Sequence, residues 1–353
     1  MCQLDDRAFV ERLDPSGMYR LTVEFPDQCR RALDIARNVT LPSAFGTVQN
    51  VVLSGLGGSA AGGDFTRALF ESTGSVPFAV NREYAMPNYV GPGTLVFATS
   101  YSGNTEETLS AYQDAKARGA KIVVVTGGGK LAALAEGDGF PLIQIPAGQP
   151  PRTALGYLFV PVAQACVQLG LLPDPGFEEA FSVLDRCVVD WSVETPFDSN
   201  DPKQLAKALQ GALSVIYGLG PWQSLVANRW KGQINENAKN MTFANAFPEL
   251  CHNEILGWVK ADGQGVEKWV QIVLQDGSES AKMKARASVT GDLTKDVCSV
   301  YNVRAVGESL LSRIMSLTLY GDFVSIYLAA LNGVDPENID SINVLKSELS
   351  KIP

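Results

Sequence analysis

A segment of ten residues, TSYSGNTEET at positions 99–108, carries an unusual density of hydroxyl groups. It directly follows the apolar run TLVFA at 94–98, which has the composition of a buried strand. The hydroxyls of Ser100, Ser102 and Thr105, with the N–H groups at the start of a helix, would suit a phosphate group. Ser and Thr also favour helix starts as ordinary caps, but behind a buried strand we favour phosphate binding. The segment therefore predicts an anion site.

A second glycine-rich turn, GLGGSA at 55–60, follows a short β-branched strand at 48–53 and opens another helix. It places Gly58 and Ser59 at the helix start, where they could contact the same anion. The turn also fits the GxGxxA variant of the dinucleotide fingerprint, which is weak alone. The acidic residue that this fingerprint requires is poorly placed, because Glu83 lies in a stretch that is not clearly a strand end. A terminal phosphate suits the two turns better than a dinucleotide.

Both turns belong to a repeated order of strand, loop and helix. The run AKIVVVTGG at 120–128 supplies another buried strand, FPLIQIPA at 140–147 a further one, and residues 154–172 an apolar helix. Strands that alternate with helices indicate an α/β fold with a parallel sheet covered on both faces. In such sheets ligands bind beyond the carboxyl ends of the strands, where both turns fall.

The second half of the chain repeats this order. Residues 213–239 again read as strand, Gly-Leu-Gly turn and helix, with Gly218 and Gly220 in the places of Gly55 and Gly57. An internal duplication of one α/β unit is therefore expected.

The segment KWVQIVLQDGSESAKMKARA at 268–287 mirrors the hydroxyl-rich segment but lacks its cluster of hydroxyls. The expected division is an N-terminal segment and first domain with the phosphate-binding loops at 1–190, a linker at 191–202, and a second domain with a C-terminal helix at 203–353.

Composition excludes several classes of protein. The net charge is −9 and the basic residues are dispersed, which argues against general nucleic-acid binding. The sequence has no run of about 18 apolar residues, and its start, MCQLDDRAFVERL, is charged, so we expect a cytoplasmic protein without a membrane span. The six cysteines are scattered and show no metal-ligand spacing, so neither disulfides nor zinc are expected.

Taken together and in order, GLGGSAAGG, SYSGNTEET, PRTALGY, NENAKNM and CHNEILGW resemble motifs of the bifunctional phosphoglucose/phosphomannose isomerases. These enzymes are built from two tandem sugar-isomerase (SIS) domains, each a mainly parallel β-sheet flanked by helices on both faces. The resemblance covers nearly the whole chain. It implies a phosphorylated hexose held by its phosphate in the first domain, a homodimer, and aldose–ketose isomerisation without metal or nucleotide cofactor.

Such a reaction needs a base that moves a proton between C1 and C2, and a donor that stabilises the enediolate oxygen. Glu236, in QINENAKN, is the candidate base. Arg152, in PPRTALGY, carries a planar, always charged guanidinium that suits the enediolate oxygen. Without the resemblance, each would read as an ordinary surface residue.

Opening of the sugar ring also needs acid–base help. His252 is the only histidine, and its imidazole titrates nearest neutral pH. The resemblance assigns it to ring opening and implies that the neighbouring subunit supplies it. Glu254 could orient this imidazole. Lys346, in SINVLKSELSK, is the best positional match to the family's ring-opening lysine, whereas Lys351 has no motif support.

Acceptance of both epimers depends, by resemblance, on a small hydroxyl residue shortly before this lysine. Glu337, Ile339 and Ser341 compete for that place and no Thr is present, so dual specificity stays open.

Three alternatives involve the same phosphate loops. A sugar-phosphate-sensing regulator would usually carry a DNA-binding module, but only about 40 residues precede the first strand. A sugar amidotransferase would need a glutaminase domain before the SIS pair, so Cys2 is expected to be incidental. A ketose-phosphate aminotransferring or deaminating enzyme stays open and would depend on ammonia or release it.

Overall fold

The computed structural model describes residues 2–349 and 351 of the 353-residue chain. The chain divides into two compact units, each discontinuous in sequence and each built on one sheet. The first-sheet unit comprises Glu24–Asp185 and Gly307–Met315. The second-sheet unit comprises Met1–Val23, Arg186–Val306 and Ser316–Pro353.

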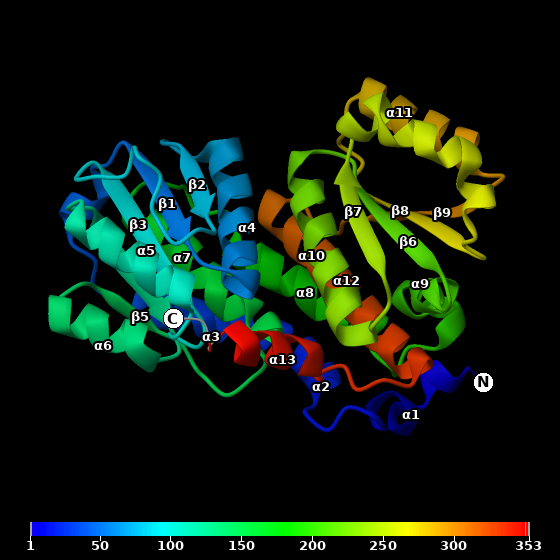
Figure 1. Cartoon of the computed structure of the whole chain (residues 1–353), viewed down its shortest axis with the longest axis horizontal. Coiled ribbons are helices and arrows are strands. Elements are labelled where there is room, and N and C mark those ends of the chain that lie inside the picture. The colour runs from blue at the N-terminus through cyan, green and yellow to red at the C-terminus, as the bar shows by residue number, and fades with distance from the viewer. Residues whose placement is uncertain (1, 350, 352–353) are drawn as a thin grey trace. The chain divides into compact units, whose positions relative to one another are not determined.

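The first-sheet unit contains a five-stranded parallel sheet with the order β2-β1-β3-β4-β5 (Figure 1). Its strands are β1 (Asn50–Ser54), β2 (Phe78–Asn81), β3 (Thr94–Ser100), β4 (Lys121–Thr126) and β5 (Leu142–Gln144). The central strand β3 is buried along its whole length, as a parallel strand covered on both faces must be. The change of strand order between β1 and β3 places the loops after these two strands side by side.

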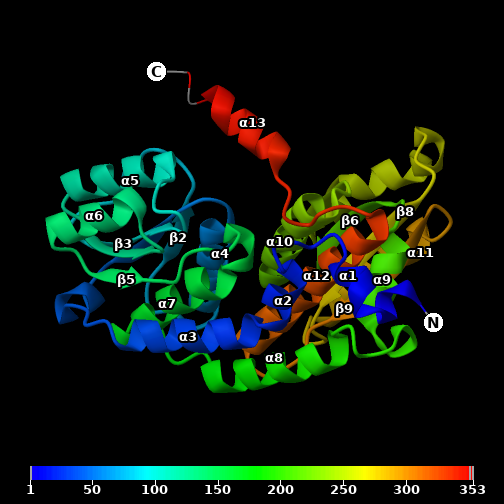
Figure 2. The same ribbon diagram turned by 90° about the horizontal axis from the view of Figure 1, so that it is seen from below.

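Helices cover both faces of this sheet, with α5 and α6 on one side and α3 and α7 on the other (Figure 2). The helices of this unit are α3 (Phe25–Arg37), α4 (Gly57–Thr73), α5 (Glu106–Ala117), α6 (Gly129–Asp138), α7 (Leu155–Gln168) and most of α8 (Phe177–Trp191). On the α5 side, Tyr112 and Leu131 pack against Val96 and Val124 of the sheet. The predicted apolar helix at 154–172 is α7, which packs closely on α4.

The second-sheet unit contains a four-stranded parallel sheet with the order β7-β6-β8-β9. Its strands are β6 (Leu213–Gly218), β7 (Thr242–Ala246), β8 (Trp269–Gln275) and β9 (Cys298–Arg304). Its helices are α1 (Arg7–Glu11), α2 (Met18–Val23), α9 (Asp201–Leu209), α10 (Pro221–Ala238), α11 (Ala281–Thr294), most of α12 (Leu310–Asn332) and α13 (Asp340–Leu349). The expected α/β class with two parallel sheets is therefore confirmed.

Helix α12 is, among the described residues, the one helix long and apolar enough to cross a membrane by length and composition alone. Its most apolar window is 94% buried inside the protein. Trp230 donates its indole N–H to the Leu317 carbonyl at 2.7 Å, and a Cβ on Gly321 would lie 2.3 Å from the same nitrogen. These contacts are those of a core helix, and a single such helix is weak evidence for a membrane span.

Residues 191–202, the proposed linker, are held by hydrogen bonds within the second-sheet unit. Lys203 is fully buried, and its ammonium group donates to the Val193 and Thr195 carbonyls at 2.9 and 2.7 Å and to Asp5 at 3.0 Å. The Asn200 side chain caps α9 by accepting from the Lys203 N–H at 3.1 Å. The proposed domain boundary here stays a prediction.

Candidate active site

The hydroxyl-rich loop joins β3 to α5 in the first-sheet unit. Ser100, the last residue of β3, is buried, and its Oγ lies 2.8 Å from Thr105 Oγ1. Ser100 Oγ also accepts from the Gly103 N–H at 3.1 Å. Thr105 stands at the N-cap of α5, but its hydroxyl turns to Ser100 instead of capping the helix. The start of α5 and its positive dipole end thus border a paired set of hydroxyls.

The rest of this loop is braced against the turn between β4 and α6. Ser102 is exposed and accepts from the Asn104 N–H at 3.2 Å, while the Asn104 side chain accepts from the Lys130 N–H at 3.1 Å. Gly103 has φ +67°, and a Cβ there would lie 1.7 Å from the Gly128 carbonyl oxygen. Only glycine fits this position, so the loop that presents Ser102 has a fixed shape.

The turn between β1 and α4 lies against the end of β3. A Cβ on Gly55 would come within 2.7 Å of the Thr99 carbonyl oxygen and 2.8 Å of Ser59 Cβ. Ser59 is buried in the first turn of α4, and Gly58 precedes it. The two predicted phosphate-binding turns are therefore neighbours at the carboxyl edge of the sheet.

Arg152 belongs to a third loop at this edge. It lies in a 3₁₀ turn, Pro151–Thr153, between β5 and α7, and its side chain is buried. A Cβ on Gly58 would lie 3.0 Å from the Pro151 carbonyl oxygen, so this turn touches the start of α4. The structure thus brings the turns carrying Gly58, Ser59 and Arg152 together with the Ser100–Thr105 loop. Hydroxyls, helix-start N–H groups and a turn that carries an arginine thus meet at this edge, a combination that suits an anion.

The corresponding loop of the second sheet is filled by the protein's own carboxylate. Glu279, just before α11, accepts from the N–H groups of Asp276 and Gly277 at 2.6 and 2.9 Å. The same carboxylate accepts from the Gln223 amide, in the first turn of α10, at 3.4 Å. The duplicated fold therefore does not repeat the hydroxyl-lined site.

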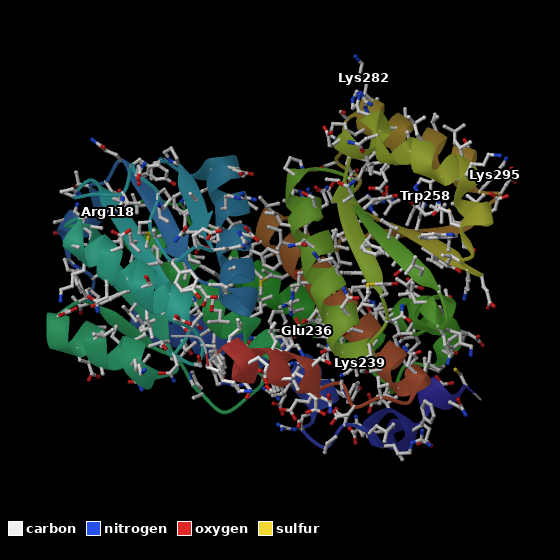
Figure 3. All side chains as sticks on the ribbon, viewed as in Figure 1. Arg118, Glu236, Lys239, Trp258, Lys282 and Lys295 are labelled. Carbon is white, nitrogen blue, oxygen red and sulfur yellow. The ribbon has the colours of Figure 1, made fainter. Side chains whose placement is uncertain are left out.

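Glu236 is half-buried on the last turns of α10 (Figure 3). Arg229, Gln233 and Asn237 follow one another at four-residue spacing along this helix. Arg229 and Gln233 donate to the Asp322 carboxylate of α12 at 2.9 and 2.8 Å, and Asn237 donates to Ser325 at 2.9 Å. This polar row fixes the rotation of α10, and with it the direction in which Glu236 leaves the helix.

Asp322 is the acidic member of that row. Burial raises the pKa of its carboxyl, and the bonds from Arg229 and Gln233 oppose this rise.

His252 ends a 3₁₀ turn, Glu249–His252, and its side chain is exposed. The nearby Glu254 makes hydrogen bonds of its own: its carboxylate accepts from the Tyr217 hydroxyl and from the Asn245 amide. Tyr217 in turn accepts from the Trp258 indole at 2.9 Å. Burial, followed by the Glu254 carboxylate, raises the pKa of the Tyr217 phenol. An orienting role of Glu254 towards His252 stays a prediction.

Lys346 lies on α13, where its side chain is exposed. Of the three candidates for epimer tolerance, Glu337 accepts from the Ser16 hydroxyl, Ile339 is half-buried, and Ser341 is exposed in the first turn of α13. Glu236, His252 and Lys346 thus come from three separate elements of the second-sheet unit.

Sequence reasoning missed two residues that shape the Arg152 loop. The Tyr101 hydroxyl accepts from the Gln149 N–H at 3.1 Å, across 48 positions of sequence. Gln28 of α3 donates to the Thr153 carbonyl at 2.9 Å. Tyr101 belongs to the motif SYSGNTEET, whereas no sequence pattern marks Gln28. Among the described residues, no group of three or more His, Cys, Asp or Glu side chains is placed to hold a metal ion.

Comparison with known families matches most of the chain. Residues 47–137 match the SIS domain, and residues 198–349 match the bacterial phospho-glucose isomerase C-terminal SIS domain. A hypothetical protein from Thermus thermophilus has a similar solved structure, with a TM-score of 0.73 at 19% identity, covering 99% of this chain and 93% of that one. At this identity the likeness shows the fold alone.

Curated relatives match along almost the full length. The chain is 42% identical to a bifunctional phosphoglucose/phosphomannose isomerase from Caldicellulosiruptor bescii, over 95% of this chain and 99% of that protein. It is 33% identical to a protein of the same name from Aquifex aeolicus, over 90% and 94% of the two chains. With two SIS domains and this extent of identity, the chain belongs to the family of bifunctional phosphoglucose/phosphomannose isomerases.

Proposed function

We propose that the protein interconverts fructose 6-phosphate with glucose 6-phosphate, mannose 6-phosphate or both, by proton transfer through a cis-enediolate. The observation that carries this proposal is the meeting of three loops at the carboxyl edge of the first sheet. Two of them offer hydroxyls and helix starts, and the third offers a buried guanidinium. A phosphate and a developing enediolate oxygen are the two anions of this reaction, and the edge has groups for both.

In this proposal the phosphate is held by Gly58, Ser59, Ser100, Ser102 and Thr105. Binding energy from this remote group would orient the reacting carbons. Arg152 would stabilise charge on the enediolate oxygen, because a guanidinium stays charged throughout the reaction. Glu236 would remove the proton from one carbon and return it to its neighbour.

Ring opening would be assisted by His252 and Lys346. We further propose a homodimer in which each subunit supplies His252 to its neighbour, which agrees with the exposed position of that side chain. The protein would act in the cytoplasm.

The test is to incubate the purified protein with fructose 6-phosphate in buffer without metal or nucleotide, and to measure glucose 6-phosphate and mannose 6-phosphate separately. Glu236→Gln should lose at least about a thousandfold in kcat, since proton transfer would lack its base. Glu71→Gln, an exposed carboxylate at the end of α4, is the matched control and should keep full activity.

Both products would support dual specificity, and one product would confine the enzyme to a single epimer. If neither forms while the sugar phosphate still binds, the isomerase proposal fails. Product formation that requires ammonia, or the release of ammonia during turnover, would favour the aminotransferring or deaminating alternative instead.

A further inference from the structure

Tyr101 lies in the middle of the hydroxyl-rich loop, but its side chain is only 8% exposed. Its backbone carbonyl accepts from the Gly127 N–H at 3.1 Å, and its phenolic oxygen accepts from the Gln149 N–H at 3.1 Å. Burial raises the pKa of this phenol, so it stays neutral at ordinary pH. Tyr101 is therefore a buried residue of the phosphate loop itself, and its hydroxyl contacts a second loop.

The bond to Gln149 leads directly to Arg152. The Gln149 amide donates to Thr153 Oγ1 at 3.0 Å, and this hydroxyl donates to the Pro150 carbonyl at 2.8 Å. Pro150 and Pro151 fix their own φ angles, so the segment 149–153 moves as one stiff turn. A shift of the Gln149 backbone would carry Arg152 with it.

The segments around the Tyr101–Gln149 hydrogen bond are tightly packed. A Cβ on Gly127 would lie 2.8 Å from the Tyr101 carbonyl oxygen and 3.2 Å from Ala147 Cβ. The loop after β3, the end of β4 and the segment before Gln149 are thus in direct contact. On its other side, the Arg152 turn is held by Gln28 through the Thr153 carbonyl.

We infer that Tyr101 is a positioning residue that couples the phosphate loop to Arg152. This inference rests on the proposed function, in which Arg152 faces the reacting end of the sugar. Phosphate bound by Ser100, Ser102 and Thr105 would hold the loop on both sides of Tyr101. The bond to Gln149 would transmit this restraint to the Arg152 turn, so that the phosphate helps to position the group at the reacting end.

The kinetic test uses Tyr101→Phe, which keeps the ring and removes the acceptor. We expect kcat to fall about tenfold, the size expected from losing one buried hydrogen bond. The inhibition constant of inorganic phosphate should stay within about twofold, because the phosphate hydroxyls are intact. Tyr112→Phe is the matched control: it removes a phenol that donates to Asp138 at 2.7 Å in the same unit, and it should keep full activity.

A double-mutant cycle separates positioning from a general loss of stability. In an Arg152→Ala background, adding Tyr101→Phe should lower kcat by less than a further factor of about two, since the side chain that Tyr101 positions is already gone. A full tenfold further loss would overturn the inference while leaving the proposed function standing.

Hydrogen–deuterium exchange with inorganic phosphate tests the coupling without turnover. Phosphate should slow exchange in segments 100–108 and 147–154 of the wild type, but only in 100–108 of Tyr101→Phe. No effect on 147–154 in the wild type would overturn the inference, whatever the activity. An inactive wild type that still shows this pattern would remove the isomerase proposal and leave the coupling intact.

Discussion

Two threonines at the start of α5, Thr105 at the N-cap and Thr108 in the first turn, differ in the hydrogen bonding of their hydroxyls. Thr105 Oγ1 lies 2.8 Å from Ser100 Oγ at the edge of the proposed phosphate site. Thr108 Oγ1 is buried and, within the described chain, has no hydrogen-bond partner. The same substitution at the two positions therefore separates binding from folding.

Thr105→Val should lower kcat/KM for fructose 6-phosphate about 10- to 100-fold, the cost of one hydrogen bond to a charged group. Thr108→Val should leave the kinetics unchanged and raise the free energy of unfolding by about 1 kcal/mol, since it removes an unpaired buried hydroxyl. Steady-state kinetics measures kcat/KM and urea unfolding measures the free energy of unfolding, each for both variants. Unchanged kinetics in Thr105→Val and Ser102→Ala together would contradict the phosphate assignment.

At the scale of elements, the contact between α4 and α7 depends on a glycine. A Cβ on Gly62 would lie 2.8 Å from the Leu158 carbonyl oxygen, which is backbone and cannot turn aside. Gly62→Ala should lower the free energy of unfolding by about 1 to 3 kcal/mol through overpacking. Gly137→Ala, at an exposed position of α6 with no atom within 4 Å of the new Cβ, should raise the free energy of unfolding by about 0.5 to 1 kcal/mol. Urea unfolding of the two variants measures both changes. Equal effects at the two sites would contradict the close approach of Gly62 to the Leu158 backbone.

The N-terminal segment is tied to α9 by an ion pair between the half-buried Asp5 and the buried Lys203. Burial alone would raise the pKa of Asp5, but the bonds from Lys203, Phe197 and Cys2 lower it overall. A lowered carboxyl pKa gives stability that is present above the unfolded pKa near 3.9 and is lost as the pH falls through the folded value. Acid titration of unfolding should therefore show a smaller loss below about pH 4 in Asp5→Asn than in the wild type. An equal loss would mean that the pair does not hold the segment.

The elements differ in how far the sequence could predict them. Strand β3 was predicted because its apolar run is unbroken, but β2 and β7 were not, since these short edge strands are half-exposed and lack such a run. The hydroxyls of Ser100 and Thr105 are local to one motif, so their meeting was predictable. The bond of Tyr101 to Gln149 was not, because backbone N–H groups have no signature in sequence and the partners are 48 positions apart.

At the scale of the whole molecule, the two parallel sheets carry different loops. The first sheet carries the paired hydroxyls and the Arg152 turn, whereas Glu279 fills the corresponding loop of the second. The second-sheet unit instead carries Glu236 and His252. In the proposed function, the phosphate-binding groups therefore come from the first-sheet unit and the candidate base from the second-sheet unit.

The proposed exchange of His252 between subunits can be tested with two inactive variants. In a mixed dimer of His252→Ala and Glu236→Gln subunits, one site would combine an intact Glu236 with the partner's intact His252. Random pairing makes half of the dimers mixed, with one working site of two, so activity should recover to about a quarter of the wild type. If His252 serves its own subunit, every site of the mixed dimer keeps one defect and no activity returns. Native mass spectrometry must show the mixed dimer in the same sample, so that an absence of activity counts against the exchange and an absence of dimers counts against the homodimer itself.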